Sequence, residues 1–475
     1  MRPTKALILL PIILAEACLV GPNYHRPSTA VPPAYKEAAP AAEKVAWKPA
    51  EPRDVAGRGK WWEIFSDPVL NGLEEQVAVS NQTIAQAEAQ YRSARALVRG
   101  VRANLFPTIT AEGTASRSSG VYTSSPGAGQ AAPATPMYDV PVEASWEIDL
   151  FGKIRRGLQA QAATAQASAA DLEAVRLSMH AELAAEYFLL RGLDAQIDLL
   201  NKTVAAYKTT LVLTQNRYKQ GIVSGVDVAQ AKTQFNSTMA QATDLGTARA
   251  QAEHAIAVLV GRAPQEFGLE PSKSQNQPPV IPVGLPSGLL ERRPDIAASE
   301  RLVAAANAKI GAAVAAYFPS LSLTGYGEYQ GSPLSVLFTL PNRAWYLGAS
   351  LAGTIFDGGA RRSARQQAVA NHDAAVAAYR QTVLSAFQQV EDNLVALRVM
   401  TEEATYRNEA AAQADLALKL ANSRYMNGVT SYLEVVTAQA TALSNELTAV
   451  ELLTKRLTAS LNLIKALGGD WPAPK

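Results

Sequence analysis

The chain has 475 residues, a formal net charge of +2 and a charged fraction of 18%. A nearly neutral chain has no electrostatic basis for binding nucleic acid, so no nucleic-acid partner is predicted. The single cysteine, Cys18, excludes an internal disulfide and a cysteine-based metal site. The four histidines lie far apart in the sequence, so we expect no metal site and no cofactor.

The first residues have the features of an export signal. Arg2 and Lys5 give a positive start, and the apolar core over 6–14 is too short to span a bilayer. We therefore predict a signal peptide over 1–17. Cys18 follows at once, which indicates a lipoprotein cleavage site that would leave Cys18 acylated. The alternative is cleavage by an ordinary signal peptidase, because the usual leucine is absent three residues before the cysteine.

The next segment, 18–60, is rich in proline, alanine and glutamate and has no periodicity. It predicts an extended, lipid-anchored segment that tethers the chain or wraps onto a larger body. No later stretch reaches 18 consecutive apolar residues, so we expect no transmembrane helix, and strands would make any membrane crossing. Asp67 followed by Pro68 predicts the start of the first helix.

Four segments alternate between apolar and polar residues, as strands do. In "VEASWEIDL" the apolar side chains share one face, and Glu143, Glu147 and Asp149 lie on the other. The four predicted strands are 107–116, 142–150, 319–329 and 345–355. An apolar face backed by a polar face at this length is also typical of transmembrane barrel strands. The alternative is a soluble sheet with one face in water.

Two very long helices are predicted over 155–218 and 361–425, because these runs contain no proline and little glycine. Each would be about 95 Å long. The last helix carries apolar residues at alternating spacings of three and four, which predicts coiled-coil packing. The predicted seam positions are Leu433, Val436, Ala440, Leu443, Leu447, Val450, Thr454, Leu457, Leu461 and Ile464.

The phrases "RYKQGIVSGVDV" and "RYMNGVTSYLEV" resemble each other and follow the two long helices. Gly221 and Gly428 stand where a helix would end in a left-handed residue, a conformation that glycine adopts without steric cost. A serine follows three residues later, and an acidic residue three residues after it, as in a capping box. The predicted capping boxes pair Ser224 with Asp227 and Ser431 with Glu434. Each phrase therefore predicts a tight hairpin between two helices.

Similar segments recur in the same order in both halves of the chain, which predicts an internal two-fold repeat. Each repeat contains a helix, strands and a long helical hairpin. The predicted organisation is a signal peptide over 1–17, a lipid-anchored segment over 18–60, a first repeat over 61–274, a proline-rich linker over 275–294 and a second repeat over 295–475.

Four strands in a membrane would leave open edges with unsatisfied backbone groups. Useful barrels need about eight strands or more, so a membrane-inserted chain would have to oligomerise. Two copies would supply eight strands and three copies twelve. Glu143, Glu147 and Asp149 would then line a water-filled duct.

The chain resembles the TolC-like outer membrane efflux proteins, and in particular the OprM-type, NodT-like lipoprotein branch that serves resistance–nodulation–division (RND) efflux systems. The resemblance covers nearly the whole chain. It rests on "CLVGPNYHRP", "WWEIFSDPVLNGL", "ERRPDI", the two hairpin phrases and "NLIKALGGDW". It implies a mainly α fold with membrane β structure: a trimer with a twelve-stranded outer membrane barrel, continued by a twelve-helix periplasmic barrel. It also implies a passive exit duct for drugs or other small toxic compounds.

The resemblance implies partners and a gate as well. The partners would be an inner-membrane RND pump and a periplasmic adaptor, or membrane fusion protein, that docks at the tips around Gly221 and Gly428. The protein would be lipid-anchored in the outer membrane and extend into the periplasm. The family gate includes an aspartate ring about ten residues before the second Arg-Tyr pair, and Asp415 occupies that place. The alternative for Asp415 is an ordinary solvated helix residue. Lys208 stands at the equivalent place in the first half.

Three other functions have less support from the sequence. An enzyme is not expected, because no Ser-His-Asp, HExxH or phosphate-loop pattern is present and "GYGEYQG" precedes no helix. A periplasmic coiled-coil scaffold without a channel would need the alternating segments to be soluble strands. A type I secretion duct for whole proteins would share the fold, although the lipoprotein-like start favours small-molecule efflux.

Overall fold

A computed structural model describes residues 19–37, 59–119, 121–122, 130–131, 134–272, 276–281 and 288–469. These residues form two compact units. The strand unit comprises the described residues up to Ser28, together with Gln90–Ser168 and Ala298–Tyr379. The helical unit comprises the described parts of Thr29–Ala89 and Ala169–Ala297 and those from Arg380 onward.

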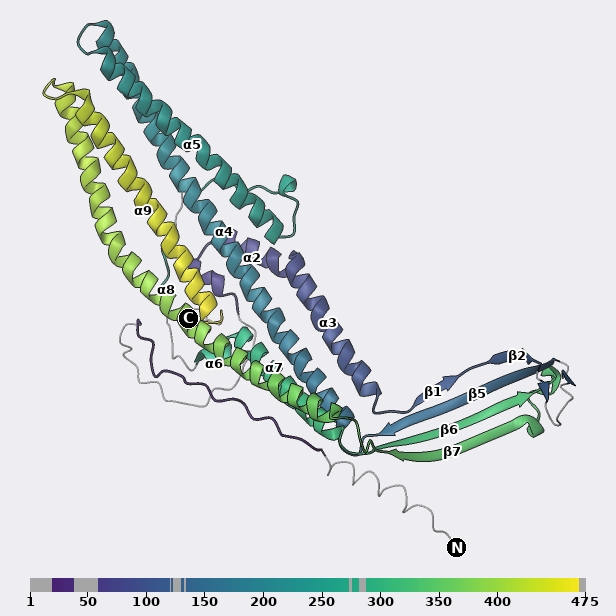
Figure 1. The fold of residues 1–475 in the computed structure, drawn as a ribbon. Coiled ribbons are helices and arrows are strands. Elements are labelled where there is room, and N and C mark those ends of the chain that lie inside the picture. Colours follow the sequence, from purple (N-terminus) through teal and green to yellow (C-terminus); the bar gives the residue numbers. More distant parts are fainter. Residues whose placement is uncertain are drawn as a thin grey trace. The chain divides into compact units, whose positions relative to one another are not determined.

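The strand unit is built on one antiparallel sheet in which β1, β5, β6 and β7 lie side by side (Figure 1). A short strand, β2, also pairs with β5, and a separate two-stranded ladder joins β3 and β4. The strands are β1 (Thr108–Ala111), β2 (Thr114–Ser118), β3 (Val121–Tyr122), β4 (Gln130–Ala131), β5 (Thr135–Ile148), β6 (Ser320–Gly331) and β7 (Arg343–Ala352).

All four predicted strand segments are found, with different ends. The first is split, because β1 and β2 pair with different parts of β5. β5 begins seven residues before the predicted start. The prediction missed these residues because Pro136 and Pro141 interrupt the alternation and proline is rare inside strands. It ends at Ile148, so placing Asp149 in the strand was wrong.

The helices occur in the same order in both halves of the chain. They are α2 (Pro68–Ser80), α3 (Gln82–Ala103), α4 (Lys153–Lys219), α5 (Gly225–Leu259), α6 (Leu289–Arg292), α7 (Pro294–Ala315), α8 (Ala360–Met426) and α9 (Tyr432–Ala466). Short 3-10 turns are η1 (Trp61–Phe65), η2 (Pro264–Glu266), η4 (Leu334–Val336) and η5 (Leu340–Asn342). Both predicted long helices are confirmed: α4 and α8 have 67 residues each. Their partners α5 and α9 have 35 each.

The predicted seam of α9 is confirmed over part of its length. Leu443, Leu457, Leu461 and Ile464 are buried. Near the hairpin, however, Leu433 is 57% exposed, and the neighbouring Tyr432 and Val435 are buried instead. The seam is displaced by one residue because the ring of Tyr432 packs against that of Tyr425, with centroids 5.2 Å apart. An aromatic ring buries more apolar surface than leucine and so determines which face turns inward.

Aromatic side chains hold η1 and α2 in the core of the helical unit. Phe65 packs on Phe188 of α4 at 4.8 Å between centroids, and Trp62 stacks on His180 at 4.6 Å. Asp67 caps α2 by accepting the backbone N–H groups of Val69 and Leu70. The predicted helix start at Asp67 is therefore confirmed. The Asp67 carboxylate also accepts the hydroxyl of Tyr187 at 2.7 Å, so the cap ties α2 to α4.

The ERRPD motif also has a structural explanation within the helical unit. Arg293 is buried and donates to the backbone carbonyl of Ala466, at the last turn of α9, and to Gln389 of α8. Its guanidinium is neutralised by Asp295, at 2.6 Å. A charge-assisted bond to a helix C-terminus satisfies a carbonyl that has no partner in its own helix.

The described N-terminal residues dock on the helices as an extended segment. In the strand unit, Arg156 of α4 donates to the carbonyls of Val20 and Gly21. Gly21 has φ +92° and lies so close to Gly311 of α7 that a Cβ would stand 2.5 Å from its Cα. Only glycine satisfies both conditions. This part of the segment therefore wraps onto the body.

Among the described residues, no helix is both long enough and apolar enough to span a membrane.

Candidate functional site

One face of the sheet is polar and the other apolar, as the alternation predicts. In the register of β5 with β6, Glu143 lies opposite Tyr326 and Glu147 opposite Ser322, while Trp146 lies opposite Leu323 between them. Side chains directly opposite each other share a face, and successive residues alternate. Glu143 and Glu147 therefore belong to the polar face. The polar face also carries Asp139, Ser145, Thr324, Glu328, Gln330 and Ser350.

Asp149 has a different environment from the two glutamates. Its carboxylate accepts the backbone N–H groups of Ile154 and Arg155 at the start of α4. It also forms an ion pair with the Arg155 guanidinium at 3.2 Å, and its side chain is 8% exposed. Asp357 makes the same contacts with Arg361 at the start of α8, where they lower the pKa of Asp357. Both aspartates connect a strand to a long helix.

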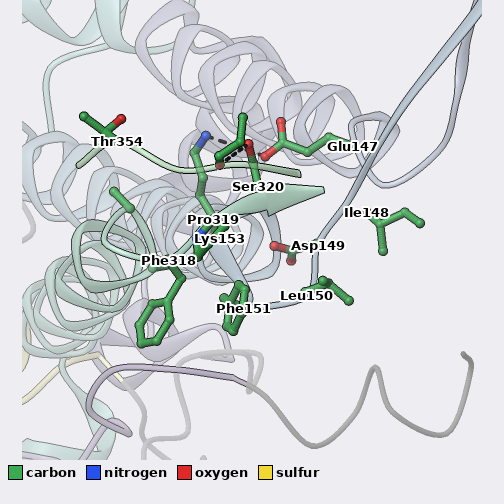
Figure 2. A pocket seen from close by; sticks show the side chains of 13 residues that line it. Glu147, Ile148, Asp149, Leu150, Phe151, Lys153, Phe318, Pro319, Ser320 and Thr354 are labelled. Atoms are coloured by element: carbon green, nitrogen blue, oxygen red, sulfur yellow. Dashed lines mark hydrogen bonds and ion pairs between the residues drawn. The ribbon is translucent and has the colours of Figure 1, made fainter. Parts of the chain in front are cut away.

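A cavity of about 200 Å³ lies within the strand unit, where β5, β6 and β7 meet the helices (Figure 2). Lys153 reaches toward Glu147 at 3.7 Å, and Phe151 stacks on Phe318 at 4.7 Å between centroids. Ser320, Ala352 and Thr354 also line it. The opposite charges of Lys153 and Glu147 balance each other at this level of the sheet.

The first helical hairpin has the predicted geometry. Gly221 has φ +71°, and its neighbour Ile222 donates its N–H to the carbonyl of Arg217, which closes the end of α4. Ser224 accepts the N–H of Asp227, and Asp227 accepts the N–H of Ser224. The predicted capping box at α5 is therefore confirmed.

The second hairpin is closed differently, and its predicted capping box was wrong. Gly428 has φ +72°, as predicted, but Ser431 makes no side-chain cap bond to α9. The carboxylate of Glu434 instead accepts the hydroxyl of Thr430 and the guanidinium of Arg424, the latter at 3.1 Å. A charged partner competes better for a carboxylate than a backbone N–H does.

The two hairpins share a small core within the helical unit. Buried Tyr425 and Tyr432 pack with Leu211 and Ala231 of the first hairpin. The guanidinium of Arg217 lies over the ring of Tyr425 at 4.9 Å, a cation–π contact that links the hairpins. Burial raises the pKa of Tyr432 to about 12. Sequence reasoning missed this core, although the repeated Arg-Tyr pair was a signal for it.

Asp415 lies on α8, before the hairpin, and is half exposed. Its carboxylate pairs with Lys419 one turn later at 2.6 Å, which raises the pKa of Lys419. Glu446 of α9 faces the same region, and burial together with the charge of Asp415 raises its pKa. Lys208, at the equivalent place in the first half, is exposed. The charge of Asp415 is thus already partly compensated within one chain.

The remaining predicted site, Cys18, lies outside the described residues. No group of three or more His, Cys, Asp or Glu side chains that could hold a metal ion occurs among the residues that the structure describes.

Comparisons with known proteins agree with this architecture. The family model "Outer membrane efflux protein" matches residues 73–262 and 285–469. The antibiotic efflux pump outer membrane protein ArpC of Pseudomonas putida is 30% identical over 473 residues, which cover 98% of this chain and 96% of that protein. The toluene efflux pump outer membrane protein TtgC, from a strain of the same species, has the same identity and coverage.

Among solved structures, the outer-membrane channel OprN superposes with a TM-score of 0.84 and is 31% identical. The match covers 95% of this chain and 99% of that one. The family model and the relatives extend over both halves of the chain, including the sheet and both helical hairpins. The chain therefore belongs to the outer membrane efflux protein family.

Proposed function

We propose that three copies of this chain form the outer membrane exit duct of a tripartite efflux pump. The observation that carries the proposal is an amphipathic sheet whose two outer strands, β1 and β7, each have one unpaired edge in the described chain. In lipid an open edge leaves N–H and C=O groups without partners, so the edges must meet other copies. All neighbouring strands are antiparallel, so β1 and β7 run in opposite directions. β7 of one copy can therefore pair with β1 of the next copy in the antiparallel arrangement of the rest of the sheet. Three copies close a barrel of twelve strands.

The polar face of the sheet lines the water-filled interior of this barrel. β6 has 12 residues and β7 has 10, which suits strands that cross a membrane. Glu143 and Glu147 face the lumen, and they give it a preference for cations, mainly through Glu143, because Lys153 partly balances the charge of Glu147. Asp149 belongs to the strand–helix junction rather than to the lumen, since its carboxylate is occupied by Arg155.

The long helices continue the duct away from the membrane as a twelve-helix barrel. Its far end is formed by the hairpin tips, where apolar side chains are exposed. They are Ile222 and Val226 on the first tip and Met426, Val429 and Leu433 on the second. Exposed apolar residues of this kind suit a protein interface, and we assign them, with Gly221 and Gly428, to the periplasmic adaptor. Through the adaptor the duct serves an inner-membrane RND pump.

The cargo is a range of drugs or other small toxic compounds. Relatives of equal identity are named for antibiotics and for toluene, so the shared architecture is compatible with chemically different cargo. A passive duct selects mainly by width and charge, and the pump supplies the specificity. Cys18 anchors the mature chain through its acyl groups, which hold the N-terminus at the membrane. Asp415 contributes the gate near the hairpin tips.

Single-channel recording in planar bilayers tests the proposal directly. The purified full-length chain should insert and give discrete conductance steps that are selective for cations. A Glu143→Gln, Glu147→Gln double variant should retain the steps and lose part of the selectivity. Absence of steps from protein that is folded and inserted would contradict the channel, and equal selectivity in the variant would contradict the assigned lumen face. Cysteine crosslinking at positions 222 and 429 should capture the adaptor.

A further inference from the structure

The helical part of the strand unit is strongly basic. The residues of α3, α4, α7 and α8 that belong to this unit contain only two acidic residues, Glu300 and Asp373. Glu300 is 3% exposed and is occupied by Tyr24 and Arg301. The basic residues are Arg92, Arg95, Arg99, Arg102, Lys153, Arg155, Arg156, Arg301, Lys309, Arg361, Arg362 and Arg365.

Four of these arginines form a stripe on α3. Arg92, Arg95, Arg99 and Arg102 follow one another at spacings of three, four and three, which places them on one face of the helix. All four are exposed. Arg95 lies over the ring of Tyr91 at 5.7 Å. The other three form no ion pair with any residue that the structure describes, so their charges are free to meet an external anion.

The stripe ends where the sheet begins. The register places the start of β1, the end of β5, the start of β6 and the end of β7 at one end of the sheet, so all four helices adjoin that end. Exposed apolar side chains flank the same junctions: Phe106 before β1 is 61% exposed, and Phe356 after β7 is 87% exposed. Arg102 is four residues before Phe106, and Arg362 and Arg365 lie in the first turns of α8. An apolar rim beside unpaired arginines matches the boundary between hydrocarbon and headgroups.

The connection from α3 to β1 lies on the apolar side of the sheet. The indole N–H of Trp146, an apolar-face residue, donates to the carbonyl of Leu105 at 3.0 Å. Pro107 also lines an apolar hollow together with Trp146 and Leu323. These contacts place the end of the arginine stripe beside the face that would meet lipid, away from the acidic face that carries Glu143.

We propose that this arginine stripe, with Arg362 and Arg365, binds the anionic headgroups of phospholipids in the leaflet next to the helices. The proposal rests on the proposed membrane insertion of the sheet. A second copy of the chain is a poor alternative partner, because its helices at this level carry the same excess of positive charge. Anionic phospholipid supplies the missing charge at the correct level.

The geometry predicts a graded contribution along the stripe. Arg92 lies about 15 Å further from the sheet than Arg102, from the rise of an α-helix. The Debye length at physiological salt is about 8 Å, so Arg92 is largely screened from headgroups that Arg102 contacts. A basic residue beside an anionic surface favours binding about fivefold. Arg99 and Arg102 therefore matter more than Arg92.

The test measures lipid retained by the purified full-length channel. The protein is equilibrated with detergent micelles that contain equal amounts of phosphatidylcholine and phosphatidylglycerol and is re-purified, and the ratio of the two retained lipids is measured. We expect enrichment of phosphatidylglycerol. It should fall severalfold or more in Arg99→Gln, Arg102→Gln and in Arg362→Gln, Arg365→Gln, and less in Arg92→Gln. The matched control is Lys208→Gln, Lys232→Gln, which removes two exposed charges of the helical unit and should change nothing.

Each alternative has its own outcome. Loss of enrichment on adding inorganic phosphate at constant ionic strength would indicate a phosphate-ion site and overturn the proposal. Variants that change ion selectivity but not lipid retention would place the stripe in the lumen and overturn it. If the variants do not fold, the wild-type protein is tested at increasing salt concentration. Phosphatidylglycerol enrichment that does not fall with salt contradicts an electrostatic contact with headgroups. Conductance steps without enrichment refute only this inference, whereas absence of steps refutes the proposed channel.

Discussion

A buried pair of titratable groups, Glu74 and His180, should keep the packing of α2 on α4 independent of pH in mildly acidic solution, and one substitution should remove this independence. Glu74 has no exposed surface, and its Oε2 lies 2.6 Å from Nδ1 of His180. Burial raises the pKa of Glu74 well above its usual range. Burial, with a smaller effect of the Arg176 charge, lowers the pKa of His180 from 6.5 to about 4. Both shifts favour a neutral pair, in which the carboxylic acid donates to the imidazole.

The neutral pair predicts a flat profile in mildly acidic solution. Above about pH 4.5, and below both the ordinary pKa of His180 and the raised folded pKa of Glu74, the folded pair holds one proton, on Glu74. The unfolded chain also holds one proton in this range, on His180. Stability is then independent of pH for this pair, because neither state takes up more protons than the other. A group whose folded pKa is raised loses its stabilising contribution as pH rises, so the contribution of the pair to folding stability is lost as pH rises through the raised folded pKa of Glu74.

Replacing Glu74 with glutamine removes the carboxyl group that holds the proton in the folded state. The introduced amide keeps a donor for Nδ1, but the folded state now holds no proton where the unfolded state holds one on His180. Stability should therefore fall as pH drops from 6.5 to about 4. The loss is about 3 kcal/mol at about 1.4 kcal/mol per pKa unit, or a few-hundred-fold in the opening constant.

Hydrogen exchange of the α2 amides measures this opening locally. Protection, corrected for intrinsic exchange, should fall steeply from pH 6.5 to 4.5 in Glu74→Gln and should change far less over this range in the wild type. A His180→Asn, Glu74→Gln double variant has no titrating group in the pair and serves as the control. A flat profile in Glu74→Gln, or a falling one in the wild type, would refute the neutral pair.

Three further predictions concern the hairpins. A Cβ on Gly192 would stand 2.3 Å from Oγ1 of Thr454, so Gly192→Ala should separate α4 from α9, cost about 1–3 kcal/mol and lower the thermal midpoint of the assembly. A Gly192→Ala, Thr454→Ala double variant should recover the thermal midpoint. If the midpoint is not recovered, the close approach of Gly192 to Thr454 is contradicted. Ser224→Ala should lower the free energy of opening of the first turn of α5, measured by hydrogen exchange, by about 1 kcal/mol. Ser431→Ala should leave the opening of α9 unchanged, because only Ser224 makes a cap bond. Equal effects would contradict the asymmetry of the two hairpins. Asp415→Ala should raise leak conductance or weaken cation preference in a bilayer, and Lys419→Ala should strengthen that preference by freeing the carboxylate. If neither substitution changes conductance or selectivity, Asp415 is not part of the gate.

Local patterns in the sequence were sufficient for much of the fold. The absence of proline predicts α4 and α8 to within two residues at each end, because helix continuity depends on backbone groups close in sequence. Gly221 and Gly428 predict both hairpin turns for the same reason. Alternation locates the four strand segments and assigns Glu143 and Glu147 to one face, since side-chain direction in a strand has a period of two.

Tertiary structure determined the features that depend on competition between partners distant in sequence. Ser431 and Glu434 have the spacing of a capping box, but Arg424 and Thr430 take the carboxylate. Leu433 fits the heptad, but Tyr425 draws Tyr432 inward in its place. The proline-containing half of β5 forms because β2 and β6 flank it. In each case the spacing of residues along the chain limits which contacts are possible, and the contacts that give the packed chain the lowest free energy are the ones that form.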